Sequence, residues 1–279
     1  MTQTPILIMT YRRYENTKIL LSLLKKFRQK NIYIFNDGIK NKFHKEEHKK
    51  TRNLIKNYKK KNVNIKLLLP KKNLTQKRNL PYALDWVFKN NDTAIILEDD
   101  CMPSRDFFKF CNVLLKKFSN DQRIAQISGV NLLNHRGFRR RNNDSYFFSK
   151  FTSSWGWATW KNRWSEFYDE DILDWPKVKN ENWLKDIFKN DKSFKFWYKY
   201  LERRFNLIDD DWDSSNNFYS TTDLNQEING PTWSDPFFGV TNQGIIPFIV
   251  ERKDVVETDL IELGHTCIPV APAMNAQDV

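Results

Sequence analysis

Hydrophobic and polar residues alternate in blocks over the first 130 positions, and these blocks predict strands and helices in turn. Short, largely apolar runs are typical of strands buried in a parallel sheet, and they occupy 5–9, 32–35, 63–69, 93–97 and 124–128. Amphipathic segments between them predict helices over 15–29, 44–61, 75–90 and 104–118. This order predicts an α/β domain with a mostly parallel sheet and right-handed crossovers.

The pattern after residue 130 is less regular. The strongest candidates for local structure are a strand at 146–149, an aromatic block over 155–164, a helix over 181–206 and a strand at 245–250. The tryptophans of the aromatic block recur at helical spacing, which suits core packing as well as contact with a sugar. Beyond about 215 the chain is polar and rich in Asn, Ser and Thr.

The strand predicted at 93–97 ends in three acidic residues, Glu98, Asp99 and Asp100. Ligands of open α/β sheets bind at the carboxyl ends of the strands, so the three carboxylates lie where a ligand is expected. They repel one another unless a cation or hydrogen-bond donors compensate them. Mg2+ and Mn2+ commonly bind one or two carboxylates together with substrate phosphates. The pattern favours a metal–diphosphate site, and the alternative is an acidic turn before the helix at 104–118.

The segment over 95–108 reads IILEDDCMPSRDFF and resembles the GT-A glycosyltransferases, above all those of the N-acetylglucosaminyltransferase I type. In that group an apolar strand, an EDD motif, a short turn and a DFF-containing helix follow one another. The resemblance covers roughly residues 5–215. It implies a Rossmann-like GT-A fold, α/β with a mostly parallel sheet flanked by helices, over 1–215. A less regular, divergent C-terminal extension over 216–279 would pack on this domain or trail from it.

This resemblance implies a metal-dependent enzyme that moves a sugar from a nucleotide-diphosphate donor, UDP-linked by preference, to an acceptor hydroxyl with inversion. The acceptor would be a glycan or a lipid-linked molecule. Asp100 would bind Mn2+ or Mg2+, Asp99 would contact the ribose and Glu98 the donor sugar. The cation would stabilise the leaving diphosphate as a Lewis acid.

Further positions match the nucleotide-binding segments of the family. The first strand and its basic turn run from Ile6 through Thr10 to Arg13, and Arg13, or next Arg12, matches the arginine that contacts the nucleotide. Asp37 matches an aspartate that recognises uracil. Arg78 lies in the helix that precedes the acidic strand and would be near the nucleotide.

The acceptor side of the implied site is carried by the second half of the chain. Trp155 and Trp157 resemble a loop that shapes the donor and acceptor sites. An inverting transferase needs a base, and Asp213, in a Trp-Asp pair, is the best match, followed by Asp211; an acidic helix start is the alternative. His265 weakly resembles a C-terminal histidine that binds the metal or the diphosphate.

Charge is distributed unevenly along the chain, whose net charge is +12. Residues 1–80 contain 22 Lys and Arg against 4 Asp and Glu, and the remainder contains 24 against 30. Such a basic region raises the hypothesis of a nucleic-acid-binding protein, but no RNP motif, zinc finger or helix-turn-helix accompanies it, and we expect no nucleic-acid partner. A diphosphate accounts for part of the basic charge. The lysines over 40–72 are either plain surface or hold the enzyme near an anionic membrane.

Cysteine content and hydropathy bear on the compartment. The three cysteines, Cys101, Cys111 and Cys267, show no CxxC spacing, so neither a disulfide framework nor a zinc site is expected. No apolar stretch near the start has the length of a signal or membrane-spanning segment. A soluble, cytoplasmic protein is therefore expected, with peripheral membrane association open. Ser214 to Asn217 depart from the family pattern, which keeps a catalytically degenerate scaffold or lectin-like module as an alternative.

Overall fold

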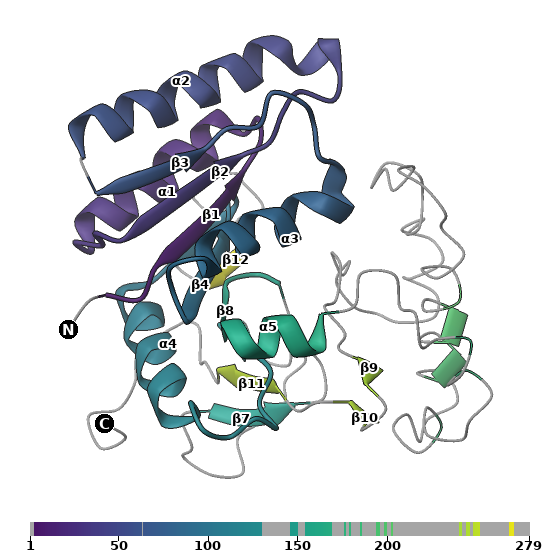
Figure 1. Ribbon diagram of the computed structural model, residues 1–279. Coiled ribbons are helices and arrows are strands. Elements are labelled where there is room, and N and C mark those ends of the chain that lie inside the picture. Colours follow the sequence, from purple (N-terminus) through teal and green to yellow (C-terminus); the bar gives the residue numbers. More distant parts are fainter. Residues whose placement is uncertain are drawn as a thin grey trace.

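The computed structural model describes most of the first 168 residues and short segments beyond them (Figure 1). The described residues are 3–62, 64–129, 146–149, 154–168, 176, 179, 185, 194–195, 198–199, 202, 240–241, 244–245, 248–251 and 268–270.

Strands and helices alternate through the first 117 residues, as the hydrophobic pattern predicts. The elements up to α4 are β1 (Ile6–Thr10), α1 (Tyr14–Lys26), β2 (Ile32–Asn36), the 3-10 turn η1 (Lys42–His44), α2 (Lys45–Lys61), β3 (Ile65–Leu68), α3 (Thr75–Phe88), β4 (Thr93–Glu98), β5 (Cys101–Pro103) and α4 (Arg105–Lys117). The later elements are β6 (Ile127–Ser128), β7 (Tyr146–Ser149), β8 (Trp157–Trp160), α5 (Lys161–Phe167), β9 (Val240–Thr241), β10 (Gly244–Ile245), β11 (Phe248–Glu251) and β12 (Ile268–Val270).

The main sheet has the strand order β3-β2-β1-β4-β8-β6-β11-β7. The first four strands are parallel to one another, and β8 runs antiparallel to both β4 and β6. The carboxyl ends of β1, β2, β3 and β4 therefore meet at one edge of the sheet. The prediction of an α/β fold with a mostly parallel, helix-flanked sheet is confirmed.

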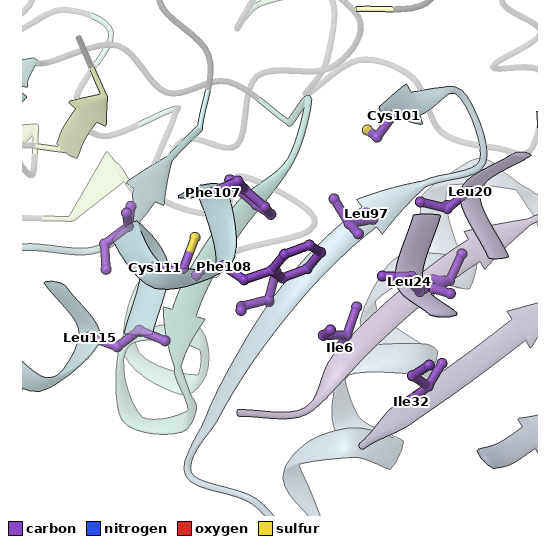
Figure 2. Packing of buried hydrophobic residues seen from close by; sticks show 14 of the residues in the cluster. Ile6, Leu20, Leu24, Ile32, Leu97, Cys101, Phe107, Phe108, Cys111 and Leu115 are labelled. Atoms are coloured by element: carbon purple, nitrogen blue, oxygen red, sulfur yellow. The ribbon is translucent and has the colours of Figure 1, made fainter. Parts of the chain in front are cut away.

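Side chains of the central strands pack alternately on the two faces of the sheet. Ile6 and Ile8 of β1 lie in one core cluster with residues of α1, α2 and α4, whereas Leu7 lies in the other with residues of α3 and α5. Figure 2 shows the first cluster, in which Leu24 of α1 and Phe108 of α4 lie beside β1 and β4. Full burial of one such side chain stabilises the fold by about 1.5–3 kcal/mol, so the layers are firmly held together.

Several elements differ from the sequence-based prediction. The strand expected over 124–128 is limited to Ile127–Ser128, and the aromatic block contains a strand at Trp157–Trp160 in spite of the helical spacing of its tryptophans. All four residues of β8 are buried because it lies inside the sheet, between β4 and β6. Periodicity cannot distinguish a short buried strand from a buried helix. The helix α5 begins only at Lys161.

Three strand pairings join distant parts of the chain. The strand predicted at 146–149 is present as β7, and it pairs with β11 from the region after 215. β11 also pairs with β6, so this late segment is part of the main sheet. β5, which sequence reasoning treated as a turn, pairs with β12. Within the described part of the chain, no helix has the length and apolarity needed to cross a bilayer.

Candidate functional site

The acidic residues after β4 lie beside the turn that follows β1. Met9 of β1 is in register with Glu98 of β4, which brings the next residues of both strands together. The backbone N–H of Tyr11 donates to Oδ2 of Asp99 at 3.3 Å. The Asp99 side chain is 8% exposed and that of Asp100 is 29% exposed. Asp100 therefore presents the more accessible carboxylate of the two.

Arg13 bridges these two carboxylates. Its Nη1 atom lies 3.0 Å from Oδ1 of Asp99 and 2.6 Å from Oδ2 of Asp100. Burial alone would lower the pKa of Arg13, but the negative charges of Asp99, Asp100 and Glu98 outweigh it and raise the pKa. The ion pairs join residues that are more than 80 positions apart, and the parallel pairing of β1 with β4 makes them possible.

Asp99 remains costly to ionise in spite of this partner. Burial raises the pKa of Asp99 to about 6, while the Arg13 guanidinium and the Tyr11 N–H oppose the rise. Desolvation of a carboxylate penalises its charged form, and such strongly shifted groups gather at functional sites. Positive charge beside Asp99 therefore favours its ionised form, as the guanidinium of Arg13 does.

A second cluster surrounds Asp37, which follows β2. Asp37 is only 4% exposed. Its Oδ1 accepts from the backbone N–H groups of Gly38 and Leu74 at 2.7 and 2.9 Å, and its Oδ2 accepts from Nδ2 of Asn73 at 3.0 Å. The side chain of Asn79 also donates to this carboxylate; burial raises the pKa of Asp37, and these hydrogen bonds oppose the rise. Asp37 therefore anchors the segment that precedes α3.

The Asp37 turn requires a close backbone approach. A Cβ atom placed on Gly38 would lie 2.2 Å from the carbonyl carbon of Lys72. Ile39 forms an isolated parallel bridge with Lys72, which continues the pairing of β2 and β3 past their ends. Only glycine fits position 38, because the backbone atoms of Lys72 cannot move aside for a Cβ atom.

Two residues of α2, Arg52 and His48, contact the same turn. Arg52 donates from Nε to Oδ1 of Asn36 at 2.9 Å and from Nη2 to the carbonyl oxygens of Asn36, Asp37 and Pro70. His48 Nε2 lies 2.8 Å from the carbonyl oxygen of Asp37. These contacts hold the carboxyl ends of β2 and β3 together.

His48 corrects a sequence-based interpretation. The basic, polar neighbours of His48 in the sequence predict a surface position, but His48 is only 7% exposed, and the centroids of its ring and the Tyr11 ring are 5.5 Å apart. The available signal was the helical spacing of His48, Thr51 and Ile55, all of which are buried on one face of α2. Burial lowers the pKa of His48.

The other residues expected near the nucleotide occupy different environments. Thr10 is buried, and its hydroxyl donates to the carbonyl oxygen of Phe35 at 2.8 Å and accepts from Asn36. Arg12 points to Glu47 of α2, with which it forms an exposed ion pair of 2.8 Å. Arg78 is exposed on α3. The structure therefore joins Arg13, rather than Arg12, to the acidic residues.

The tryptophan pair divides between core and surface. Trp157 is 2% exposed and lies in the core cluster that contains Leu7 and Ile96. Of the two alternatives for this residue, core packing and contact with a sugar, its environment fits core packing. Trp155 is partly exposed, next to Gly156. Trp160 packs in the opposite cluster, where its indole N–H donates to the carbonyl oxygen of Leu115.

Three expected site residues, Asp211, Asp213 and His265, lie outside the described residues. The expected helix over 181–206 is described at a few isolated positions only.

The carboxylates after β4 suit a hard divalent cation. In the described ranges, no three His, Cys, Asp or Glu side chains converge into a complete ligand set. Mg2+ and Mn2+ do not require one, because one or two carboxylates with phosphate and water oxygens complete their coordination. The accessible carboxylate of Asp100 beside the buried one of Asp99 provides that partial set.

No protein-family model matches the chain, and no curated protein matches it. Among solved structures it is similar to mannosyltransferase PcManGT from Pyrobaculum calidifontis, in complex with GDP-Man and Mn2+, with a TM-score of 0.44 and 10% identity; 61% of this chain and 48% of that chain are covered. This chain thus spans about half the length of that protein.

Two further structures are similar over different shares of the chain. 4-Diphosphocytidyl-2C-methyl-D-erythritol synthase from Anaerococcus prevotii gives a TM-score of 0.38 at 13% identity, over 72% of this chain and all of that chain. The glycosyltransferase GlyE of Streptococcus pneumoniae gives 0.32 at 13% identity, over 91% of this chain and 55% of that chain. Each is a partial similarity and assigns no activity to this chain.

Proposed function

We propose that this chain is a metal-dependent GT-A glycosyltransferase, related in design to the N-acetylglucosaminyltransferase I type. The observation that carries the proposal is the meeting of Arg13, Asp99 and Asp100 at the carboxyl edge of the parallel strands. The donor carries a negatively charged diphosphate, which requires positive charge beside it. The two carboxylates can hold a divalent cation for this purpose, and the guanidinium adds a second positive charge. The EDD motif followed by a DFF-containing helix supports the same assignment.

The donor side of the reaction is assigned to residues of the first half of the chain. Asp100 would hold Mn2+ or Mg2+, and the bound cation would supply positive charge against the diphosphate that leaves. Arg13 would donate to phosphate oxygens, Asp99 would orient the ribose and Glu98 the donor sugar. Thr10 and Asp37 support the strand ends beneath the nucleotide, and their contacts keep that edge in place. Preorganised charge of this kind needs little rearrangement as the bond breaks.

The acceptor side rests on the sequence resemblance. Asp213, or next Asp211, would take the proton from the acceptor hydroxyl as the sugar is transferred with inversion. Trp155 is the tryptophan proposed to contact a sugar, and His265 is proposed near the diphosphate. We propose a UDP-linked donor and a glycan or lipid-linked acceptor.

A thermal-shift screen of nucleotide sugars with and without Mn2+ tests the donor site. A ligand at a hundred times its dissociation constant stabilises a protein by about 2.7 kcal/mol, so a UDP-sugar should raise Tm by several degrees in the presence of Mn2+. Asp100→Asn should abolish the shift. Asp92→Asn is the matched control, because Asp92 is exposed just before the opposite, amino end of β4.

The outcomes separate the candidate functions. Wild-type binding together with sugar transfer or slow donor hydrolysis supports the enzyme. Mn2+-dependent donor binding without turnover of any donor would favour the degenerate binding module. No shift with any nucleotide sugar would contradict the proposed function.

A further inference from the structure

The backbone of Arg13 is fixed at the site by hydrogen bonds, whereas its side chain is partly exposed to solvent. It directly precedes α1, and its carbonyl oxygen accepts from the backbone N–H of Thr17 at 3.0 Å and from the Thr17 hydroxyl at 2.8 Å. The Arg13 side chain is 55% exposed. The Cα position of Arg13 is therefore fixed, and its exposed guanidinium can change position by side-chain rotation.

The guanidinium lies where a cation is expected. A single nitrogen, Nη1, contacts Oδ1 of Asp99 and Oδ2 of Asp100 at 3.0 and 2.6 Å. A divalent cation on Asp100 would therefore stand against a like charge that already shares the same carboxylate. Like charges at such short distances repel strongly near a partly buried site.

The two carboxylates differ in how firmly they are placed. Asp99 is buried and also accepts from the backbone N–H of Tyr11, so it keeps its position if Arg13 leaves. Asp100 is the more exposed of the pair. Movement of Arg13 would thus free Asp100 for a cation without dismantling the turn.

We propose that Arg13 competes with the divalent cation for Asp100 and that the donor diphosphate relieves the competition by drawing the guanidinium onto its own oxygens. This inference rests on the proposed function, since it takes the donor to be a nucleotide diphosphate. It makes Arg13 the residue that couples metal binding to donor binding. Coupling between two ligands is reciprocal, so the cation also strengthens binding of the nucleotide.

Mn2+ binding to the full chain, measured by the loss of free-Mn2+ electron paramagnetic resonance signal, tests the proposal without any turnover. Without nucleotide, Arg13→Gln should bind Mn2+ at least about tenfold more tightly than wild type, a difference of about 1.4 kcal/mol. Saturating UDP should tighten Mn2+ binding to wild type by a larger factor than to Arg13→Gln, because the diphosphate oxygens can bind the cation in both proteins but relieve the competition with Arg13 only in wild type. Asp100→Asn should bind little Mn2+ in either condition.

Two variants control for trivial effects of charge. Arg12→Gln removes the neighbouring positive charge, but Arg12 pairs with Glu47 rather than with the acidic motif, so it should bind Mn2+ as wild type does. Arg13→Lys keeps the charge and should also resemble wild type. Circular dichroism and Tm values show whether each variant is folded.

The following results would overturn the proposal or part of it. Equal or weaker Mn2+ binding by folded Arg13→Gln overturns the proposal, even if glycosyl transfer is found and the proposed function holds. Equal tightening in Arg12→Gln and Arg13→Gln overturns it too, because the effect would then be one of overall charge. Tighter Mn2+ binding by Arg13→Gln, with UDP changing the Mn2+ affinity of both proteins by the same factor or not at all, overturns the transfer of Arg13 to the diphosphate. If no nucleotide sugar binds at all, the proposed function fails as well.

Discussion

Asp37 is the residue whose surroundings depart most from its expected role. The family resemblance assigns it to uracil, yet its two oxygens accept hydrogen bonds from Gly38, Leu74, Asn73 and Asn79. An oxygen that already accepts from Leu74 and Gly38 has little capacity left for a base. The structure thus favours a positioning role, in which Asp37 acts through the segment before α3.

Replacing Asp37 distinguishes these roles. Asp37→Asn places an amide N–H2 where donors already converge, and an unsatisfied buried group costs about 1–3 kcal/mol. We expect that loss in urea unfolding, and a similar loss of affinity for UDP, CDP, GDP and ADP in calorimetric titrations. A loss confined to UDP, with stability unchanged, would instead assign Asp37 to direct recognition of uracil.

His48 makes stability depend on pH. Burial lowers its pKa, and the nearby Asp37 carbonyl oxygen opposes the shift. The unfolded chain takes up a proton near pH 6.5, whereas the folded protein resists it. The stability that the neutral ring provides is therefore present above this pH and is lost as the pH falls below it.

We expect His48→Gln to flatten this dependence, because glutamine keeps a donor toward Asp37 but does not titrate. The free energy of unfolding, from urea titrations at pH 7.5 and 5.5, should fall more for wild type than for the variant. Parallel pH curves for the two proteins would contradict the assignment.

Among the elements, the junction of β4, β5 and α4 carries the acidic motif. Ser104 caps α4: it has extended backbone angles, and its hydroxyl oxygen accepts from the backbone N–H of Phe107 at 3.2 Å. The apolar side of α4, which includes Phe107 and Phe108, is buried against the sheet. Cap and packing together fix where the helix begins relative to Asp100.

Ser104→Ala should lower the free energy of unfolding by about 1 kcal/mol, the usual cost of losing such a cap. Ser22→Ala is the control, because Ser22 is exposed on α1 and its hydroxyl donates to the carbonyl oxygen of Lys18 in the same helix; its effect should stay within about 0.5 kcal/mol. Equal effects of the two changes in urea unfolding would show that the cap adds nothing.

At the scale of the whole molecule, the layer formed by α1 and α2 is strongly basic. The two helices lie side by side over one face of the sheet (Figure 1). Along α2, exposed lysines recur with the spacing of one helix face; they are Lys45, Lys49, Lys56 and Lys60. Phe43, in the turn before this helix, is 92% exposed. Basic side chains with an apolar neighbour are typical of surfaces that meet anionic lipid.

We therefore expect the protein to cosediment with phosphatidylcholine vesicles that contain phosphatidylglycerol, and not with phosphatidylcholine alone. Changing the four α2 lysines to Gln should weaken binding by about 1 kcal/mol per lysine. A matched control carries Gln at four exposed lysines elsewhere, Lys109, Lys116, Lys117 and Lys161. Equal weakening by both sets would show an effect of net charge rather than of this face.

The sequence by itself determined the order of strands and helices up to α4 and the position of the acidic motif at a strand end. These features depend on hydrophobic periodicity and on neighbours within a few residues, which a linear pattern contains. The same pattern failed at β8, because a buried strand of four residues has no period of its own.

Only the tertiary structure decided which side chains meet. Arg13 reaches Asp99 and Asp100 because β1 and β4 pair in parallel with Met9 opposite Glu98. The burial of His48 likewise depends on how α2 packs against the end of β2. Register between strands and packing between layers arise from contacts distant in sequence, and local patterns do not specify them. The chemistry of this edge therefore follows from the assembled sheet, in which the guanidinium of one turn faces the carboxylates of another.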